Sequence, residues 1–176
     1  MLFTRFAPSP TGYLHRGHLL SALFVFAAAD LFSAKVRLRI EDHDQSRARK
    51  EYIDSIPEDL ERFGFKFESV SLQSNRQALY EKYAQLLFSK QKLYPCSCSR
   101  KKLFEENPIN ADGEVIYSGH CLKNPIDKNS DFALRFKTPD KTITWEDLLL
   151  GKFEENPKNQ CGDFTIKDRI SQWTYQ

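Results

Sequence analysis

The sequence has 176 residues, of which 40% are hydrophobic and 13% aromatic, and its formal net charge is +2. The length allows one domain with a proper core. The opening MLFTRFAPSP has an arginine and two prolines where a signal peptide needs an apolar run, and residues 19–32 are too short an apolar stretch to span a bilayer. We therefore expect a cytoplasmic protein without membrane contact. Its four cysteines favour metal binding or chance over a disulfide framework.

The first half of the chain predicts a parallel α/β unit. Residues 2–6 read as a strand that ends at the Pro8/Pro10 turn, and apolar residues at helical spacing predict a helix over about 18–32. Residues 35–42, KVRLRIED, alternate like a strand. Because ligands bind at the carboxyl ends of parallel strands, the segments APSPTGYLHRGH and EDHD should meet there. The broad apolar face of the first helix consists of Leu19, Leu20, Leu23, Phe24, Phe26 and Ala27, and its alanines allow close packing on a sheet.

The later elements are less regular. We expect a helix over about 49–63, kinked or restarted at Pro57 and closed at Gly64, and a second helix over about 75–90. The stretch 93–129 is rich in cysteines, turns and charges and reads as an insertion. The segments FALRFK, TITWEDLLLGKF and DFTIKDR read as β-structure. The predicted organisation is therefore a catalytic domain begun in 1–92, an insertion in 93–129, and a return in 130–176.

The turn after the first strand carries residues suited to nucleotide binding. Pro8 and Pro10 fix two backbone angles, and Gly17 lets a ligand approach the backbone. His15 and His18 are three residues apart at a helix start, where backbone N–H groups attract phosphate and histidines can donate to developing negative charge. The plainer alternative is a proline-stiffened helix start with two incidental histidines.

RFAPSPTGYLHRGH resembles the signature of the glutamyl-tRNA synthetases and their shorter relatives, the glutamyl-queuosine tRNA(Asp) synthetases. HRGH matches the HIGH motif of these class I enzymes, and RIEDHDQSR and DFTIKDRISQWTYQ resemble further family stretches. The resemblance covers essentially the whole chain. It implies a Rossmann-type parallel sheet with a small zinc-binding insertion.

The resemblance also implies roles for individual residues. His15 and His18 would be catalytic, and glutamate would pair its ammonium with Glu41 and its carboxylate with the fork of Arg5. Taken one at a time, Glu41 and Asp42 could be solvated charges, Arg5 a surface residue and Tyr175 a core residue. The implied ATP-binding residues are Pro8, Gly12, His15, Gly17 and His18, and the implied glutamate-binding residues are Arg5, Phe6, Ala7, Pro8, Ser9, Glu41 and Tyr175.

The cysteine-rich insertion predicts one structural metal. Cys96 and Cys98 form one half of a tetrahedral site, and the second half must come from Tyr117, His120 and Cys121. Chemistry alone favours His120, because the pKa of a phenol is about 10. The resemblance instead implies a zinc ion held by Cys96, Cys98, Tyr117 and Cys121, as in the glutamyl-queuosine branch. The alternative is a set of reduced thiols in a surface loop. We interpret Cys161, beside Gly162, as a free thiol. In this family the insertion approaches tRNA, and Lys101, Lys102 and Lys123 are candidate phosphate contacts.

The sequence contains no KMSKS-type loop and stops at WTYQ, where the family's fold continues. We expect a truncated sheet, and the rest comes from a longer chain or a second chain unless the gene ends early. The first hypothesis is an enzyme that activates glutamate with ATP and Mg²⁺ and transfers it to the queuosine base of tRNA(Asp). The second is a fragment of a synthetase that charges tRNA(Glu). The third is a non-catalytic remnant or half of a split enzyme.

Overall fold

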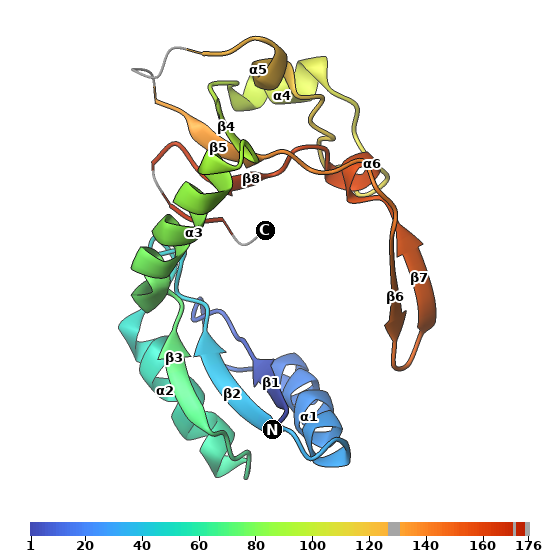
Figure 1. Ribbon diagram of the computed structural model, residues 1–176. Helices are drawn as coiled ribbons and strands as arrows, with labels where there is room; N and C mark the ends of the chain where they lie inside the picture. Colours follow the sequence, from blue (N-terminus) through green and yellow to red (C-terminus); the bar gives the residue numbers. More distant parts are fainter. Residues whose placement is uncertain (127–130, 171, 175–176) are drawn as a thin grey trace. The chain divides into compact units, whose positions relative to one another are not determined.

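A computed structural model describes residues 1–126, 131–170 and 172–174, and the chain divides into two compact units, Met1–Glu81 and Lys82–Gln176. Each unit has its own sheet (Figure 1). No helix among the described residues is both long enough and apolar enough to cross a membrane.

The first unit is built on a parallel sheet in the order β1-β2-β3. Strand β1 (Phe3–Phe6) pairs with β2 (Lys35–Ile40), which pairs with β3 (Ser69–Leu72), and the register sets Phe3 against Lys35 and Arg37 against Ser69. Helix α1 (Arg16–Leu31) connects β1 to β2, and helix α2 (Lys50–Arg62) connects β2 to β3 (Figure 1). Both crossovers join parallel neighbours, as predicted for the first one. The β3 strand was not predicted.

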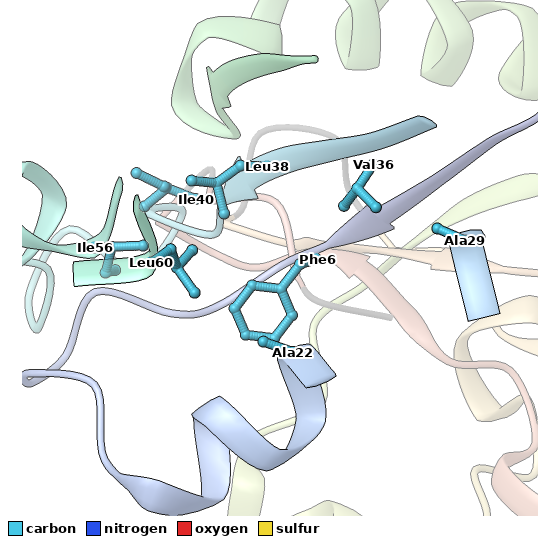
Figure 2. Close-up of a cluster of buried hydrophobic side chains, with 8 residues drawn as sticks. All are labelled: Phe6, Ala22, Ala29, Val36, Leu38, Ile40, Ile56 and Leu60. Carbon is cyan, nitrogen blue, oxygen red and sulfur yellow. The ribbon is translucent and has the colours of Figure 1, made fainter. Parts of the chain in front are cut away.

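One face of this sheet carries the core of the first unit (Figure 2). Alternate residues of β2 point to that face, where both helices pack against them. The fully buried residues of helix α1 are alanines, which allow its backbone to approach the sheet closely, and Val25 and Phe26 pack against the cluster partly buried. The buried residues of this cluster are Phe6, Ala22, Ala29, Val36, Leu38, Ile40, Ile56 and Leu60.

Two expectations about the helices need correction. The broad apolar face predicted for α1 coincides only in part with its buried face. Phe26 packs against the core as predicted, but Leu20, Leu23 and Phe24 are exposed, and the fully buried residues are Ala22 and Ala29. Helix α2 does not restart at Pro57 and runs as one element to Arg62. Its end is as predicted, since Gly64 takes the left-handed conformation, φ +84°, that favours glycine.

The second unit contains an antiparallel sheet and a separate hairpin. Strands β4 (Leu93–Cys96), β5 (Ala133–Phe136) and β8 (Thr165–Lys167) form the sheet in that order, and β6 (Ile143–Asp147) pairs with β7 (Gly151–Glu155). The three predicted β-segments are confirmed. The 3₁₀ turn η1 (Ser74–Arg76) lies in the first unit and leads into α3 (Gln77–Ser89), which begins there, continues into the second unit and matches the second predicted helix. The short helices α4 (Arg100–Glu106), α5 (His120–Lys123) and α6 (Pro157–Cys161) lie farther along the chain.

Candidate active site and metal centre

Backbone hydrogen bonds join the turn after β1 to the end of β2. The Glu41 N–H donates to the Pro8 carbonyl at 3.0 Å, and the Arg49 N–H donates to the Pro10 carbonyl at 3.2 Å. Pro8 and Pro10 are themselves buried. The two predicted segments therefore meet at the carboxyl edge of the sheet, where parallel α/β folds bind ligands.

The two histidines form the cap of helix α1. His15 is the N-cap residue: its Nδ1 accepts from the Gly17 N–H at 3.1 Å, and its own N–H donates to Nδ1 of His18 at 3.2 Å. The rings stack with centroids 3.9 Å apart. Because both Nδ1 atoms accept a hydrogen bond from a backbone N–H, each ring in its neutral form carries its proton on Nε2. Both rings can therefore donate from Nε2 to an anion.

Burial and the neighbouring His15 lower the pKa of His18 below its ordinary value of 6.5. The neutral ring that the cap requires is thus favoured in the folded protein. The stabilisation it gives is complete above pH 6.5 and is lost as the pH falls through the lowered pKa.

We expect substitutions of His15 to separate its role as the cap of α1 from its role as a hydrogen-bond donor to ATP. His15→Ala should destabilise α1 by about 1 kcal/mol, because the Gly17 N–H loses its acceptor. His15→Asn should restore that stability, since asparagine is a good N-cap, but it lacks the Nε2 donor. Hydrogen exchange at the Gly17 and His18 amides measures the cap, and ATP binding measures the donor. Equal exchange protection in wild type and His15→Ala would contradict the cap.

Gly17 lies directly against the His15 ring. A Cβ at this position would be 3.0 Å from Cε1 and 3.1 Å from Nδ1 of His15. Any side chain here would therefore press on the ring. Gly12 has no such neighbour, since nothing lies within 4 Å of a Cβ built on it.

The two acidic residues after β2 have different partners. Glu41 is only 4% exposed, and its Oε1 accepts from Arg39 Nε at 2.7 Å and lies 2.6 Å from Arg39 Nη2. Its other oxygen, Oε2, lies 3.6 Å from Nδ1 of His43. Asp42 accepts from the Ser74 N–H at 2.8 Å and from the Ser74 hydroxyl at 2.5 Å. Asp42 therefore links the end of β2 to the turn after β3. The carboxylate of Glu41 is instead held in place by Arg39.

Arginines cover the sheet face opposite the core. Arg5 lines a hollow of about 600 Å³ together with Arg37, Arg39 and Arg76. The remaining lining residues are Phe3, Thr4 and Ser71. A concentration of guanidinium groups suits an anionic ligand. Arg39 both lines this hollow with Arg5 and forms an ion pair with Glu41.

The remaining predicted glutamate-binding residues lie in different environments. The Phe6 side chain belongs to the hydrophobic core, so only its backbone can border a ligand. Ala7 is half-buried and Ser9 is exposed in the same turn. Tyr175 lies outside the described residues. The sequence analysis missed Arg39, although its alternation with the apolar residues of KVRLRI already placed it on the face away from the core.

Three thiols and one phenol converge in the second unit. The sulfur atoms of Cys96, Cys98 and Cys121 all lie within 4.8 Å of one another. The Tyr117 hydroxyl lies 3.4 Å from Cys96 Sγ and 3.6 Å from Cys98 Sγ, and accepts from the Cys121 N–H at 2.9 Å. In a tetrahedral zinc site, metal–sulfur bonds of about 2.3 Å place two sulfurs about 3.8 Å apart. These four side chains therefore fit around one metal ion.

His120 points away from this cluster. Its Nε2 lies 3.2 Å from Lys102 Nζ, and its Nδ1 lies 4.0 Å from a Glu106 carboxylate oxygen. Lys102 also pairs with Glu106, and Lys101 pairs with Glu105, each at 3.8 Å. Two of the three predicted phosphate-binding lysines thus have acidic partners on α4.

The cluster favours one thiolate. Burial opposes ionisation of Cys121, but hydrogen bonds from Tyr117, the Ser97 backbone and the other two thiols outweigh it and lower its pKa to about 7. Burial raises the pKa of Cys98 to about 11 and raises the pKa of Tyr117 as well. Metal ligands must be deprotonated, so binding here would release protons and strengthen as the pH rises.

The whole chain, residues 1–176, matches the family model for the catalytic domain of class I tRNA synthetases (E and Q). The chain belongs to this family. It is 37% identical over 98% of its length to a glutamyl-Q tRNA(Asp) synthetase of Neisseria meningitidis serogroup B, and covers 59% of that protein. It is 36% identical over 93% of its length to a glutamate–tRNA ligase of Aquifex aeolicus, and covers 36% of that protein. This member of the class I tRNA synthetases thus spans about three fifths of the first relative's length.

Solved structures support the same assignment. The crystal structure of a glutamate tRNA ligase from Elizabethkingia meningosepticum in complex with its amino acid superposes with a TM-score of 0.80 at 26% identity. The match covers 99% of this chain and 40% of that one. The parallel sheet of the first unit is therefore part of the α/β fold of class I synthetases.

Proposed function

We propose that this class I synthetase chain activates glutamate with ATP and transfers it to the queuosine base of tRNA(Asp). The observation that carries the choice of tRNA is the position of Tyr117, whose hydroxyl lies among the three thiols while His120 points elsewhere. A Cys-x-Cys pair followed by Tyr-x-x-x-Cys resembles the glutamyl-queuosine branch. The relative from Neisseria meningitidis that is 37% identical carries that name.

The proposed chemistry uses charge and position without a covalent intermediate. A carboxylate oxygen of glutamate attacks the α-phosphorus of ATP, and pyrophosphate leaves with its Mg²⁺. Nε2 donors of His15 and His18 would stabilise the negative charge that develops on the phosphate. Arg5 would hold the glutamate carboxylate, and Glu41, held by Arg39, would hold the ammonium group. Because ATP and tRNA are the proposed substrates, we place the protein in the cytoplasm.

Pyrophosphate exchange tests the activation step. The protein isolated from its own cells should exchange pyrophosphate into ATP when glutamate is present, and aspartate or glutamine should not replace glutamate. Absence of glutamate-dependent exchange, with tRNA added or not, would overturn the proposal and favour a non-catalytic role.

A second function, charging of tRNA(Glu), also has support. The Aquifex aeolicus relative is named a glutamate–tRNA ligase and is 36% identical. Both functions share the activation step, so only the choice of tRNA separates them.

We further propose that Cys96, Cys98, Tyr117 and Cys121 hold one structural zinc ion. The donor set, the short distances and the burial of three of the four side chains support it. The ion would join the end of β4 to the start of α5, two segments of the predicted insertion 93–129 that share little apolar core. It would stabilise the insertion without taking part in the chemistry.

Two single substitutions test the ligand set. Tyr117→Phe should weaken zinc binding by about 10- to 100-fold, because it removes only the oxygen donor and keeps the ring. His120→Ala should leave zinc affinity unchanged. Competition with a chromophoric chelator measures both. Loss of zinc in His120→Ala alone would show that the ligand set is wrong.

A further inference from the structure

Behind the thiol cluster, Tyr117 packs against a buried cation. The guanidinium carbon of Arg135, on strand β5, lies 3.9 Å from the centroid of the Tyr117 ring. Arg135 is 7% exposed and Tyr117 is 1% exposed. The guanidinium thus lies over the face of the ring, and the hydroxyl at the edge of the same ring lies among the sulfur atoms.

Arg135 forms no ion pair with a described carboxylate. Its Nη1 donates to the Asp163 backbone carbonyl at 2.6 Å, and its Nε has no hydrogen-bond partner among the described residues. Within those same residues no carboxylate forms an ion pair with it, and the Asp163 carboxylate instead binds Lys158, Tyr94 and the Thr138 N–H. A buried charge without a counter-charge is costly.

The metal centre proposed above supplies the missing negative charge. Three thiolates around a divalent cation sum to a charge of minus one before Tyr117 is counted. A guanidinium over the ring of the fourth ligand is attracted by the ring face and by the anionic cluster around the hydroxyl of that ring. Arginine suits this position because its planar group can stack and hydrogen-bond at once.

We propose that Arg135 is the counter-charge of the metal centre and the positioning residue for Tyr117. This inference rests on the proposed metal site and extends it to a residue outside the insertion, on a strand that pairs with β4. Arg135 touches no metal. It acts through the orientation of Tyr117 and through the field at the cluster.

Metal binding to the purified chain tests the proposal. Arg135→Gln should weaken Zn²⁺ binding by at least about tenfold, and Arg135→Lys, which keeps the charge without the planar stack, should recover part of the loss. Arg100→Gln is the matched control, because Arg100 also lies over an aromatic ring, 5.9 Å from the centroid of Phe104, but that ring belongs to no proposed metal ligand, so Zn²⁺ affinity should stay unchanged. Unchanged affinity in Arg135→Gln would overturn the proposal.

Two further readouts separate a counter-charge from a merely structural role. Arg135→Gln should reduce the rise in Tm that Zn²⁺ produces, whereas a structural role would lower Tm equally with and without metal. In a Tyr117→Phe background the effect of Arg135→Gln should shrink, since Arg135 acts through that ring; equal effects in both backgrounds would overturn the positioning role. Failure of the wild-type chain to bind Zn²⁺ or Co²⁺ would overturn the metal site itself.

Discussion

Gly162→Ala should destabilise the second unit by about 3–5 kcal/mol. Gly162 bridges Tyr117, and an added Cβ would lie 2.3 Å from the Tyr117 carbonyl oxygen and 2.6 Å from its nitrogen. Its φ of +62° adds backbone strain for any other residue. Since the obstructing atoms are backbone, Tyr117 itself must move, and its hydroxyl should leave the thiol cluster.

Tryptophan fluorescence during urea unfolding measures this effect in one unit alone, because both tryptophans, Trp145 and Trp173, lie in the second. Gly113→Ala is the control: Gly113 has φ +82° but nothing within 4 Å of an added Cβ, so only the strain of about 1 kcal/mol should appear. Equal stability of the two variants would contradict the close contact between Gly162 and Tyr117.

Glu41→Gln should raise the KM for glutamate about a hundredfold, the equivalent of about 2.7 kcal/mol. The substitution removes the charge that would pair with the substrate ammonium, and it leaves the Arg39 guanidinium facing a neutral amide in place of a carboxylate. The dependence of pyrophosphate exchange on glutamate concentration measures the change.

The adjacent carboxylate provides the matched control. Asp42 is equally buried, but Ser74 occupies its oxygens, so Asp42→Asn should reduce stability by about 1–3 kcal/mol and leave the KM for glutamate nearly unchanged. A large rise in KM for Asp42→Asn, or none for Glu41→Gln, would contradict the assignment of Glu41 to the ammonium group.

The meeting of the Pro8/Pro10 turn with the end of β2 could be predicted from the sequence, because the local signals there agree. Two prolines end β1, alternation marks β2, and a parallel pair must bring Pro8 and Glu41 to one edge. These predictions depended on short-range rules, and long-range packing did not override them.

Where packing decides, the sequence gives a poorer guide. The strand β3 is exposed over three of its four residues and has no alternation, and only its pairing with β2 defines it. Helix α1 is apolar on all sides, so its periodicity could not show that Ala22 and Ala29, rather than Leu20 and Leu23, contact the sheet.

The second unit shows the same limit at the thiol cluster. Spacing left Tyr117 and His120 as competing donors, and simple chemistry favoured the imidazole. What orients Tyr117 lies far along the chain: Arg135 stacks on its ring and Gly162 bridges its backbone. The local sequence around Tyr117 predicts neither contact.

The most direct test of the central claim is the transfer of labelled glutamate by the protein isolated from its own cells. Three RNA preparations serve as acceptors: tRNA(Asp) with queuosine, tRNA(Asp) without it, and tRNA(Glu). We expect glutamylation of queuosine-containing tRNA(Asp) alone. Glutamylation of tRNA(Glu), with none on queuosine-containing tRNA(Asp), would contradict it and assign the chain to the tRNA(Glu)-charging branch.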